Sequence, residues 1–232
     1  MKMRIIALLL LALLGLLVYL TQSQWRTMYD RYRGMETVES VRQKYEASVS
    51  ARLSDALKSA GFSGFPDSLL LLAFKEEALL EVYGYREGWH LIKTYPFTAS
   101  SGGLGPKLRE GDRQIPEGIY QIGYLNPNSS YHLSLQINYP NESDRTRASA
   151  EGRTSPGKDI FIHGKQVSIG CIALGDPAIE EVFLLGAHAF PKGIRVIISP
   201  RDFRKNPQFP EIPSVNWAEQ LYRQIREALE SV

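Results

Sequence analysis

One thiol and one imidazole lie close together in this sequence. Cys171 is the lone cysteine of the chain and follows His163 by eight residues in IFIHGKQVSIGCIAL, with a glycine beside each of the two. A cysteine thiol is only a few per cent ionised at neutral pH and needs a base to become a good nucleophile. The spacing therefore predicts a nucleophilic cysteine with His163 as its base. Cysteine is also among the most buried residue types, so a packing role for Cys171 stays open at this point.

The pattern of residues 159–164, DIFIHG, alternates as a β-strand does, and it places His163 at the strand end on the face opposite two isoleucines. The segment that follows is too short for a long excursion, so we expect it to turn back and bring the thiol toward the imidazole. Gly170 allows a close backbone approach. The amides of Gly170 and Cys171 could then donate hydrogen bonds to a developing oxyanion.

Short apolar and aromatic runs separated by glycine and charged turns predict strands through most of the chain. The first three predict a meander, and many short strands with few helices predict a mainly β domain of sandwich or barrel type. The predicted strands are 69–74, 78–85, 89–95, 118–124, 131–139, 159–164 and 194–199.

Three segments have the spacing of amphipathic helices. Residues 37–60 carry apolar side chains every three or four positions and end at Gly61, and this helix is either a stalk or a helix docked on the domain. Residues 177–187 begin with a proline, and residues 215–229 repeat an apolar stripe. We expect four parts, namely a membrane segment (1–24), a helical linker (25–66), a catalytic domain (67–202) and a helical tail (203–232).

The first residues predict export from the cytoplasm. Two basic residues precede an unbroken apolar run over residues 5–20, which fits the layout of an export signal. No small-residue cleavage site follows, so we expect an uncleaved membrane anchor, with cleavage and release as the alternative. The run is at the short end of the length needed to span a bilayer.

Composition excludes several classes of protein. The 232 residues include 44% hydrophobic residues and have a formal net charge of +2, with no long basic block that would suit a nucleic acid. One cysteine excludes an intrachain disulfide and a zinc site built on cysteine pairs.

The motif around Cys171 resembles the YkuD-type L,D-transpeptidase catalytic domain of bacterial cell-wall enzymes. The resemblance lies in the order of three features: the pair HG at residues 163–164, the motif S-x-G-C at residues 168–171, and a hydrophobic residue directly after the cysteine. An aspartate follows a few positions later. A second motif, IPEGIY at residues 115–120, matches the family's upstream strand entry. The similarity covers about residues 69–199, and GPK, EGD, PEG and NYP followed by DR are most similar to the YafK-like branch. The resemblance implies the periplasm as the compartment.

This resemblance implies roles for the site residues. Cys171 would attack the amide after the diaminopimelate of a peptidoglycan stem peptide and form a thioester, with His163 as the general base. The Gly164 carbonyl would orient the histidine, Ser168 would open the cysteine motif, and no metal or cofactor is required. Transfer of the acyl group to an amine of another stem or of a lipoprotein gives a transpeptidase, transfer to water gives a hydrolase, and an inactive peptidoglycan-binding module is a third alternative.

The sequence departs from the family pattern at two positions. Ile169 stands where a second histidine is usual, and Ala173 replaces a common arginine. A cation for the stem carboxylates would then come from Arg145, Lys107 or Arg153, and we expect Arg145 to supply it because it follows the NYPNESD turn. Tyr139 and Asp144 are expected to line the cleft.

Overall fold

Strand β1 (Leu69–Phe74) lies near the centre of the fold, and all six of its side chains are buried. The computed structural model describes residues 15, 19, 21, 32 and 34–232. Within these residues an eight-stranded sheet has the order β3-β2-β1-β8-β4-β5-β6-β7. A strand buried on both faces has a continuous apolar sequence rather than an alternating one, which explains the run LLLLAF.

The sheet mixes antiparallel and parallel pairs. β1, β2 and β3 form the predicted antiparallel meander, and β8 lies parallel to β1 on its other side. β4, β5 and β6 continue in antiparallel pairs from β8, and β7 lies parallel to β6. The remaining bounds are β2 Leu79–Tyr85, β3 Trp89–Pro96, β4 Gly118–Ser129, β5 His132–Ile137, β6 Ile160–His163, β7 Ile172–Ala173 and β8 Ile194–Ser199.

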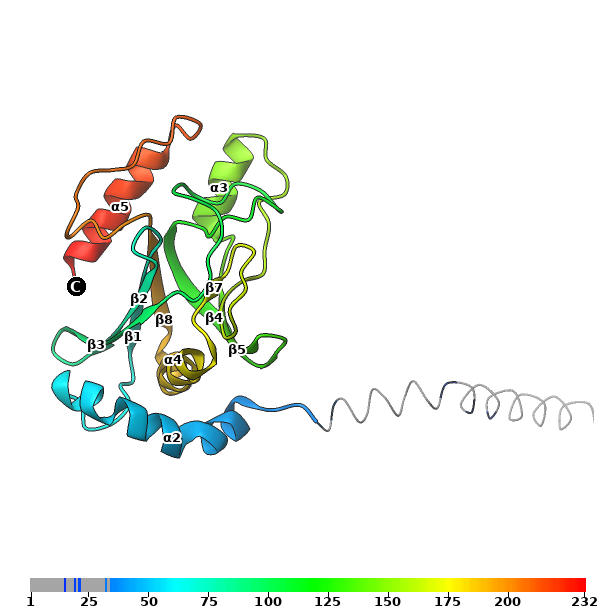
Figure 1. Cartoon of the computed structure of the whole chain (residues 1–232). Coiled ribbons are helices and arrows are strands. Elements are labelled where there is room, and N and C mark those ends of the chain that lie inside the picture. The colour runs from blue at the N-terminus through cyan, green and yellow to red at the C-terminus, as the bar shows by residue number, and fades with distance from the viewer. Residues whose placement is uncertain (1–14, 16–18, 20, 22–31, 33) are drawn as a thin grey trace, which may run out of the picture. The chain divides into compact units, whose positions relative to one another are not determined.

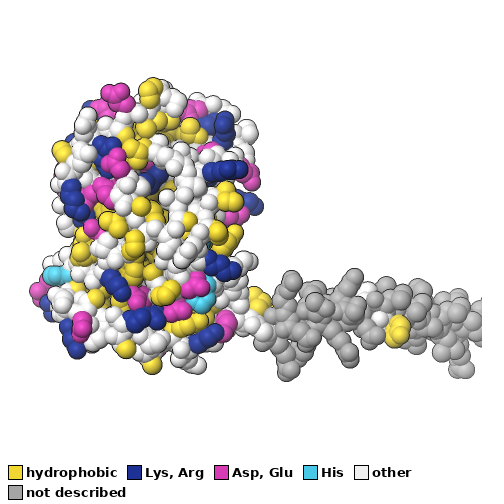
Figure 2. All heavy atoms as spheres, in the orientation of Figure 1, with side chains coloured by type: hydrophobic (Ala, Val, Ile, Leu, Met, Phe, Trp, Pro, Cys, Tyr) yellow, Lys and Arg dark blue, Asp and Glu magenta, His cyan; other side chains and the backbone are white. Residues whose placement is uncertain are grey.

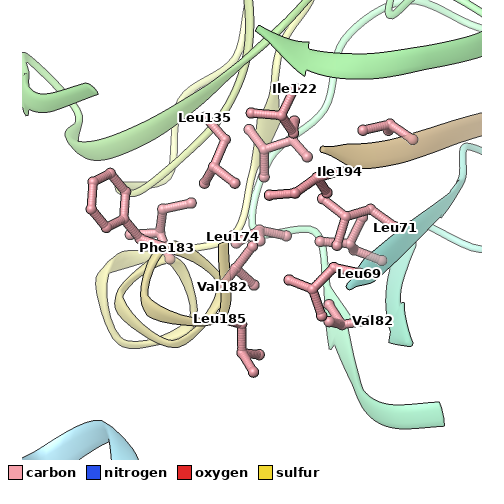
Figure 3. Close-up of a cluster of buried hydrophobic side chains, with 14 of the residues drawn as sticks. Leu69, Leu71, Val82, Ile122, Leu135, Leu174, Val182, Phe183, Leu185 and Ile194 are labelled. Carbon is pink, nitrogen blue, oxygen red and sulfur yellow. The ribbon is translucent and has the colours of Figure 1, made fainter. Parts of the chain in front are cut away.

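Helices cover both faces of the sheet (Figure 1). Alternate β1 side chains enter two separate cores, with Leu71 in the core shared with α2 (Val38–Ser59) and α4 (Asp176–Ala189). Figure 3 shows Val182 and Leu185 of α4 among the side chains of that core. Leu72 belongs instead to the core under α5 (Ala218–Glu230). The connecting helices are α3 (Glu142–Ala150) and the 3₁₀ turn η1 (Phe190–Lys192).

Helix α2 is docked on the domain rather than held away from it. Thr37 and Ser40 form a reciprocal capping box at its start, and four side chains on one face are buried: Val41, Val49, Leu53 and Leu57. Residues 37–232 form one compact unit that includes α2 and α5. Lys, Arg, Asp and Glu side chains are interspersed on the face of this unit that Figure 2 shows.

The prediction of a mainly β domain with few helices is confirmed. The strands form one open sheet, curved like half a barrel, and not two packed sheets. Helix α3 was not predicted because its sequence is almost entirely polar, with Ala148 as its one buried residue. Strand β7 was missed because it has two residues. The predicted anchor at residues 5–20 lies outside the described residues apart from Gly15 and Tyr19, and no helix in the described part of the chain has the length and apolar character to cross a membrane.

A buried ion pair joins the two central segments of the sheet. Lys75 directly follows β1, Glu117 directly precedes β4, and the Lys75 Nζ to Glu117 Oε1 distance is 2.9 Å with side chains only 5% and 0% exposed. Lys75 Nζ also donates to the carbonyls of Gly105 and Ile115, and Tyr222 of α5 donates to the other Glu117 oxygen at 2.8 Å. Burial lowers the pKa of Lys75, and Glu117 opposes that shift.

We expect Glu117→Ala to lower the free energy of unfolding by about 3–5 kcal/mol, because it leaves the Lys75 ammonium buried without its carboxylate. Urea denaturation followed by circular dichroism measures this loss. The control is Glu219→Ala, which breaks an exposed pair with Arg223 and should cost at most about 1 kcal/mol. Similar losses of unfolding free energy for the two variants would show that the buried pair stabilises the domain no more than the exposed pair does.

Candidate active site

Strands β6 and β7 bring the predicted cysteine and histidine to one face of the sheet. Their parallel register pairs Ile162 with Ile172 and His163 with Ala173. Continued by one residue, this register sets Cys171 beside Phe161. Because residues two apart in a strand share a face, the side chains of Cys171 and His163 are diagonal neighbours on adjacent strands.

Both side chains line one cleft of about 390 Å³. Its wall combines hydroxyl and amide groups from the β4–β5 hairpin, two aromatic rings, two apolar side chains of the loop before the cysteine, and one acidic residue, Asp159. The lining includes Ser130, Tyr131, Ser134, Asp159, Phe161, Ser168 and Ile169.

His163 is held in a defined orientation and tautomer. Its side chain is buried, and Nδ1 lies 2.6 Å from the Gly164 carbonyl oxygen. A carbonyl can only accept, so Nδ1 carries the proton and Nε2 has a free lone pair. The ring of Tyr131 lies against the imidazole, with centroids 4.6 Å apart and a 33° tilt. The geometry therefore provides a base at Nε2, and the Gly164 carbonyl has the orienting position that was predicted.

Burial keeps both partners of this pair uncharged. It lowers the pKa of His163, and the bond to the Gly164 carbonyl opposes the shift only in part. It raises the pKa of the Cys171 thiol, whose Sγ lies 3.8 Å from the Asp159 carbonyl oxygen. The resting pair is a neutral thiol beside a neutral imidazole, which suits general-base catalysis at the moment of attack.

The loop before the cysteine is fixed by two serines. The Ser168 hydroxyl accepts from the Cys171 amide at 3.2 Å and donates to the Cys171 carbonyl at 2.6 Å. The Gly170 amide donates to the Ser101 hydroxyl at 2.6 Å, and that hydroxyl donates to the Arg113 carbonyl at 2.9 Å. Both amides predicted to bind an oxyanion are thus engaged within the protein, and their oxyanion role stays a prediction that requires these bonds to open.

Glycines permit the tight course of this loop. Gly170 has φ +99°, a region that favours glycine. A Cβ on Gly164 would approach Asp176 Oδ1 to 2.6 Å and the Tyr131 carbonyl oxygen to 2.7 Å. Asp176, in the first turn of α4, also accepts from the Lys165 amide at 2.8 Å. Residues 164 and 165 therefore lie between Tyr131, which directly precedes β5, and Asp176 at the start of α4.

The four residues predicted to bind substrate do not line this cleft. Arg145 is exposed beside a different cavity and donates to the Pro140 carbonyl. Lys107 is buried and paired with Asp112 at 2.5 Å, although it is near enough to lower the pKa of Cys171 as a minor effect. Neither cation is placed to meet a carboxylate at the thiol.

Tyr139 and Asp144 have structural roles. The buried Tyr139 hydroxyl donates to the Pro156 carbonyl at 2.8 Å. Asp144 completes the capping box of α3 with Asn141 and accepts from the Tyr120 hydroxyl at 3.2 Å. Their partners lie outside the cleft, and neither Tyr139 nor Asp144 is among the residues that line it, contrary to the prediction.

Sequence reasoning missed Tyr131, Ser101 and Lys165. Tyr131 lay at the edge of a predicted strand, and its contact with His163 depends on the β5–β6 register. Ser101 is 69 residues from its partner Gly170, and no local pattern signals that bond. Among the described residues no group of three or more His, Cys, Asp or Glu side chains could hold a metal ion.

A model of the YkuD family, described as the L,D-transpeptidase catalytic domain, matches residues 70–198. The YafK proteins of Escherichia coli strains K12 and O157:H7, which are named as L,D-transpeptidases, are each 39% identical over 133 residues. That match covers 55% of this chain and 52% of each relative, so the chain spans about half the length of the curated relatives it matches.

Solved structures with lower sequence similarity also match. The helical cell shape determining protein Pgp2 from Campylobacter jejuni is 19% identical, with a TM-score of 0.49 and coverage of 76% of each chain. L,D-transpeptidase 1 of Mycobacterium tuberculosis is 16% identical, with a TM-score of 0.32 over 57% of this chain and 63% of that one.

We expect Gly164→Ala to lower the free energy of unfolding by about 1–3 kcal/mol, because the added methyl group overlaps the Tyr131 carbonyl and Asp176. It should also displace the carbonyl that holds His163. Thermal denaturation measures the first effect. Gly88→Ala is the matched control, since a Cβ there meets nothing within 4 Å, and an equal loss in both variants would contradict the close packing at Gly164.

Alkylation of Cys171 by iodoacetamide should reveal the neutral thiol. Because burial raises the thiol pKa, the thiolate fraction at neutral pH is below that of a free cysteine. The alkylation rate should keep rising with pH beyond the ordinary thiol pKa of about 8.5. A rate that is already at its plateau at neutral pH would indicate a thiolate–imidazolium pair instead.

Proposed function

Because this chain belongs to the YkuD family of L,D-transpeptidase catalytic domains, we propose that it is a cysteine acyltransferase acting on peptidoglycan stem peptides. The nucleophile is Cys171, and the bond attacked is the amide after the diaminopimelate of a donor stem. The observation that supports this most is the placement of Cys171 and a Nδ1-protonated His163 on one face of the β6–β7 pair, in one cleft.

The first half-reaction forms a thioester. His163 Nε2 accepts the thiol proton as Cys171 Sγ attacks the carbonyl carbon, and the carbonyl oxygen becomes an oxyanion. The C–N bond then breaks, and the imidazolium returns its proton to the departing amine of the terminal alanine. Release of the Gly170 amide from Ser101 would free a donor for the oxyanion, and one such donor is typically worth about 10²–10³ in rate.

The second half-reaction transfers the acyl group. An acceptor amine from another stem or from a lipoprotein lysine attacks the thioester carbonyl and loses a proton to His163, the C–S bond breaks, and the imidazolium returns the proton to the sulfur. Water in the same position would give hydrolysis. Both outcomes use the same thioester, and product analysis distinguishes them because transfer gives linked muropeptides whereas hydrolysis gives free tripeptides or released lipoprotein.

The N-terminal segment supports a location for this reaction. We propose that residues 5–20 carry the chain across the inner membrane and anchor it there, with the catalytic domain in the periplasm, where peptidoglycan is the neighbouring polymer. The apolar run after two basic residues is the basis of this proposal.

We expect an acyl adduct on Cys171 when the full chain is incubated with tetrapeptide muropeptides and analysed by intact-protein mass spectrometry. Cys171→Ala should give none, and His163→Gln should lower the acylation rate by about 10²–10⁴-fold because the base is lost. Both variants should retain the thermal stability of the unmodified chain. If the unmodified chain forms no adduct while it is folded, the inactive binding module becomes the better interpretation.

The acylation rate should fall on the acid side of neutrality. Burial lowers the pKa of His163, so the neutral base is fully present at pH 7 and is lost as the pH falls through a value below the ordinary 6.5. A profile of kcat/KM against pH should therefore have its acid limb centred below 6.5. A limb centred above that value would contradict the desolvated environment of the imidazole.

A further inference from the structure

We propose that Lys165 binds a carboxylate of the donor peptide at the mouth of the Cys171 cleft and thereby selects acidic donors. This inference rests on the proposed function and assigns a specificity-determining residue to it.

The Lys165 backbone is held in a conformation that disfavours lysine. Its amide donates to Asp176 Oδ1 at 2.8 Å, and its carbonyl accepts from Thr98 Oγ1 at 2.9 Å. Its φ of +57° lies in the left-handed region, where glycine is free of strain and other residues are not. Five other non-glycine residues of the described structure share this conformation, and Lys165 differs from them in that its side chain carries an ammonium group next to the Cys171 cleft.

The Lys165 side chain contacts two residues that line the cleft, and Lys165 itself lies just outside the lining. Lys165 is exposed, and its Nζ donates to the Ser130 carbonyl at 2.7 Å and lies 6.0 Å from the centroid of the Tyr131 ring. Ser130 and Tyr131 both line the cleft, and Tyr131 lies against His163. The ammonium group therefore lies next to the part of the cleft wall that Ser130 and Tyr131 form.

The charge of this ammonium group is not balanced within the described structure. No described Asp or Glu side chain lies within ion-pair distance of Lys165, whereas Lys75, Lys107 and Lys192 each have a carboxylate partner. An ammonium group has three donors, and the Ser130 carbonyl uses one. The other two fit a ligand carboxylate, and a charge-assisted bond is stronger than a neutral one.

A donor tetrapeptide offers two carboxylates near the scissile amide, one on the side chain of diaminopimelate and one at the terminal alanine. Three donors test the proposal: the unmodified peptide and the two peptides in which one carboxylate is an amide. Acylation of the full chain is followed by mass spectrometry. Lys165→Gln should lower kcat/KM for the unmodified donor by about 10- to 100-fold, mainly through KM. The loss should vanish for the one donor that lacks the bound carboxylate, which identifies that carboxylate.

Four controls separate recognition from misfolding. Lys165→Arg should retain most of the rate, and Lys165→Gly, which relieves the left-handed strain, should lose as much as Lys165→Gln. Lys192→Gln removes a charge whose partner is Asp67, outside the cleft, and should leave kcat/KM unchanged. Iodoacetamide, a neutral probe, should alkylate Cys171 at the same rate in all of these variants.

The inference is overturned if Lys165→Gln leaves kcat/KM unchanged or lowers it equally for all three donors. Absence of acylation in the unmodified chain would instead overturn the proposed function on which the inference rests. The two failures are distinguishable because the second concerns every donor and needs no variant.

Discussion

The buried pair of Lys75 and Glu117 is the interaction on which the rest of the domain depends. It joins the end of β1 to the start of β4 in the middle of the sheet, and its oxygen atoms also fix Gly105 and Tyr222 of α5. The loop between Gly105 and Glu117 is therefore attached at both ends to one charge pair. The same loop carries the Arg113 carbonyl that accepts from Ser101, and Ser101 in turn holds the Gly170 amide. The loop and these two hydrogen bonds together connect the centre of the sheet to Gly170, the residue before Cys171.

Neutrality is the second constraint on the site. A cleft with few charges and a half-buried thiol favours the uncharged form of both reacting groups. The imidazole gains its function from orientation, since the Gly164 carbonyl fixes the tautomer and the Tyr131 ring fixes the plane. In the proposed reaction, charge would appear only during the attack by Cys171, in surroundings where fixed dipoles act strongly on it.

Much of the fold could be predicted from the sequence wherever burial of one face requires apolar residues at a regular spacing. The seven predicted strands correspond to β1–β6 and β8, although β4 runs five residues beyond the predicted end at residue 124, and α4 and α5 lie close to their predicted ranges. Helix α3 and strand β7 have no apolar period, so no local signal marked them. Cys171 and His163 were found because they share a short segment. Their supporting groups, Ser101, Tyr131 and Asp176, act through contacts set by the sheet register, which local spacing does not encode. Lys107 was expected to bind a substrate carboxylate, but its ammonium group is instead paired with Asp112, five residues later in the same loop.

The parallel pairing of β1 with β8 has a consequence for how the chain acquires its structure. Leu69 pairs with Ile194, a separation of 194 − 69 = 125 residues, and closing so long a loop precedes any gain from the contact. The central strand of the sheet is thus completed by β8, the strand of this sheet that comes last in sequence order. Until residues 194–199 have emerged, the apolar run of β1 lacks one of its two neighbours, and a nascent chain in that state exposes an unpaired strand edge that is prone to aggregation. The domain gains its core late, when nearly all of its sequence is present.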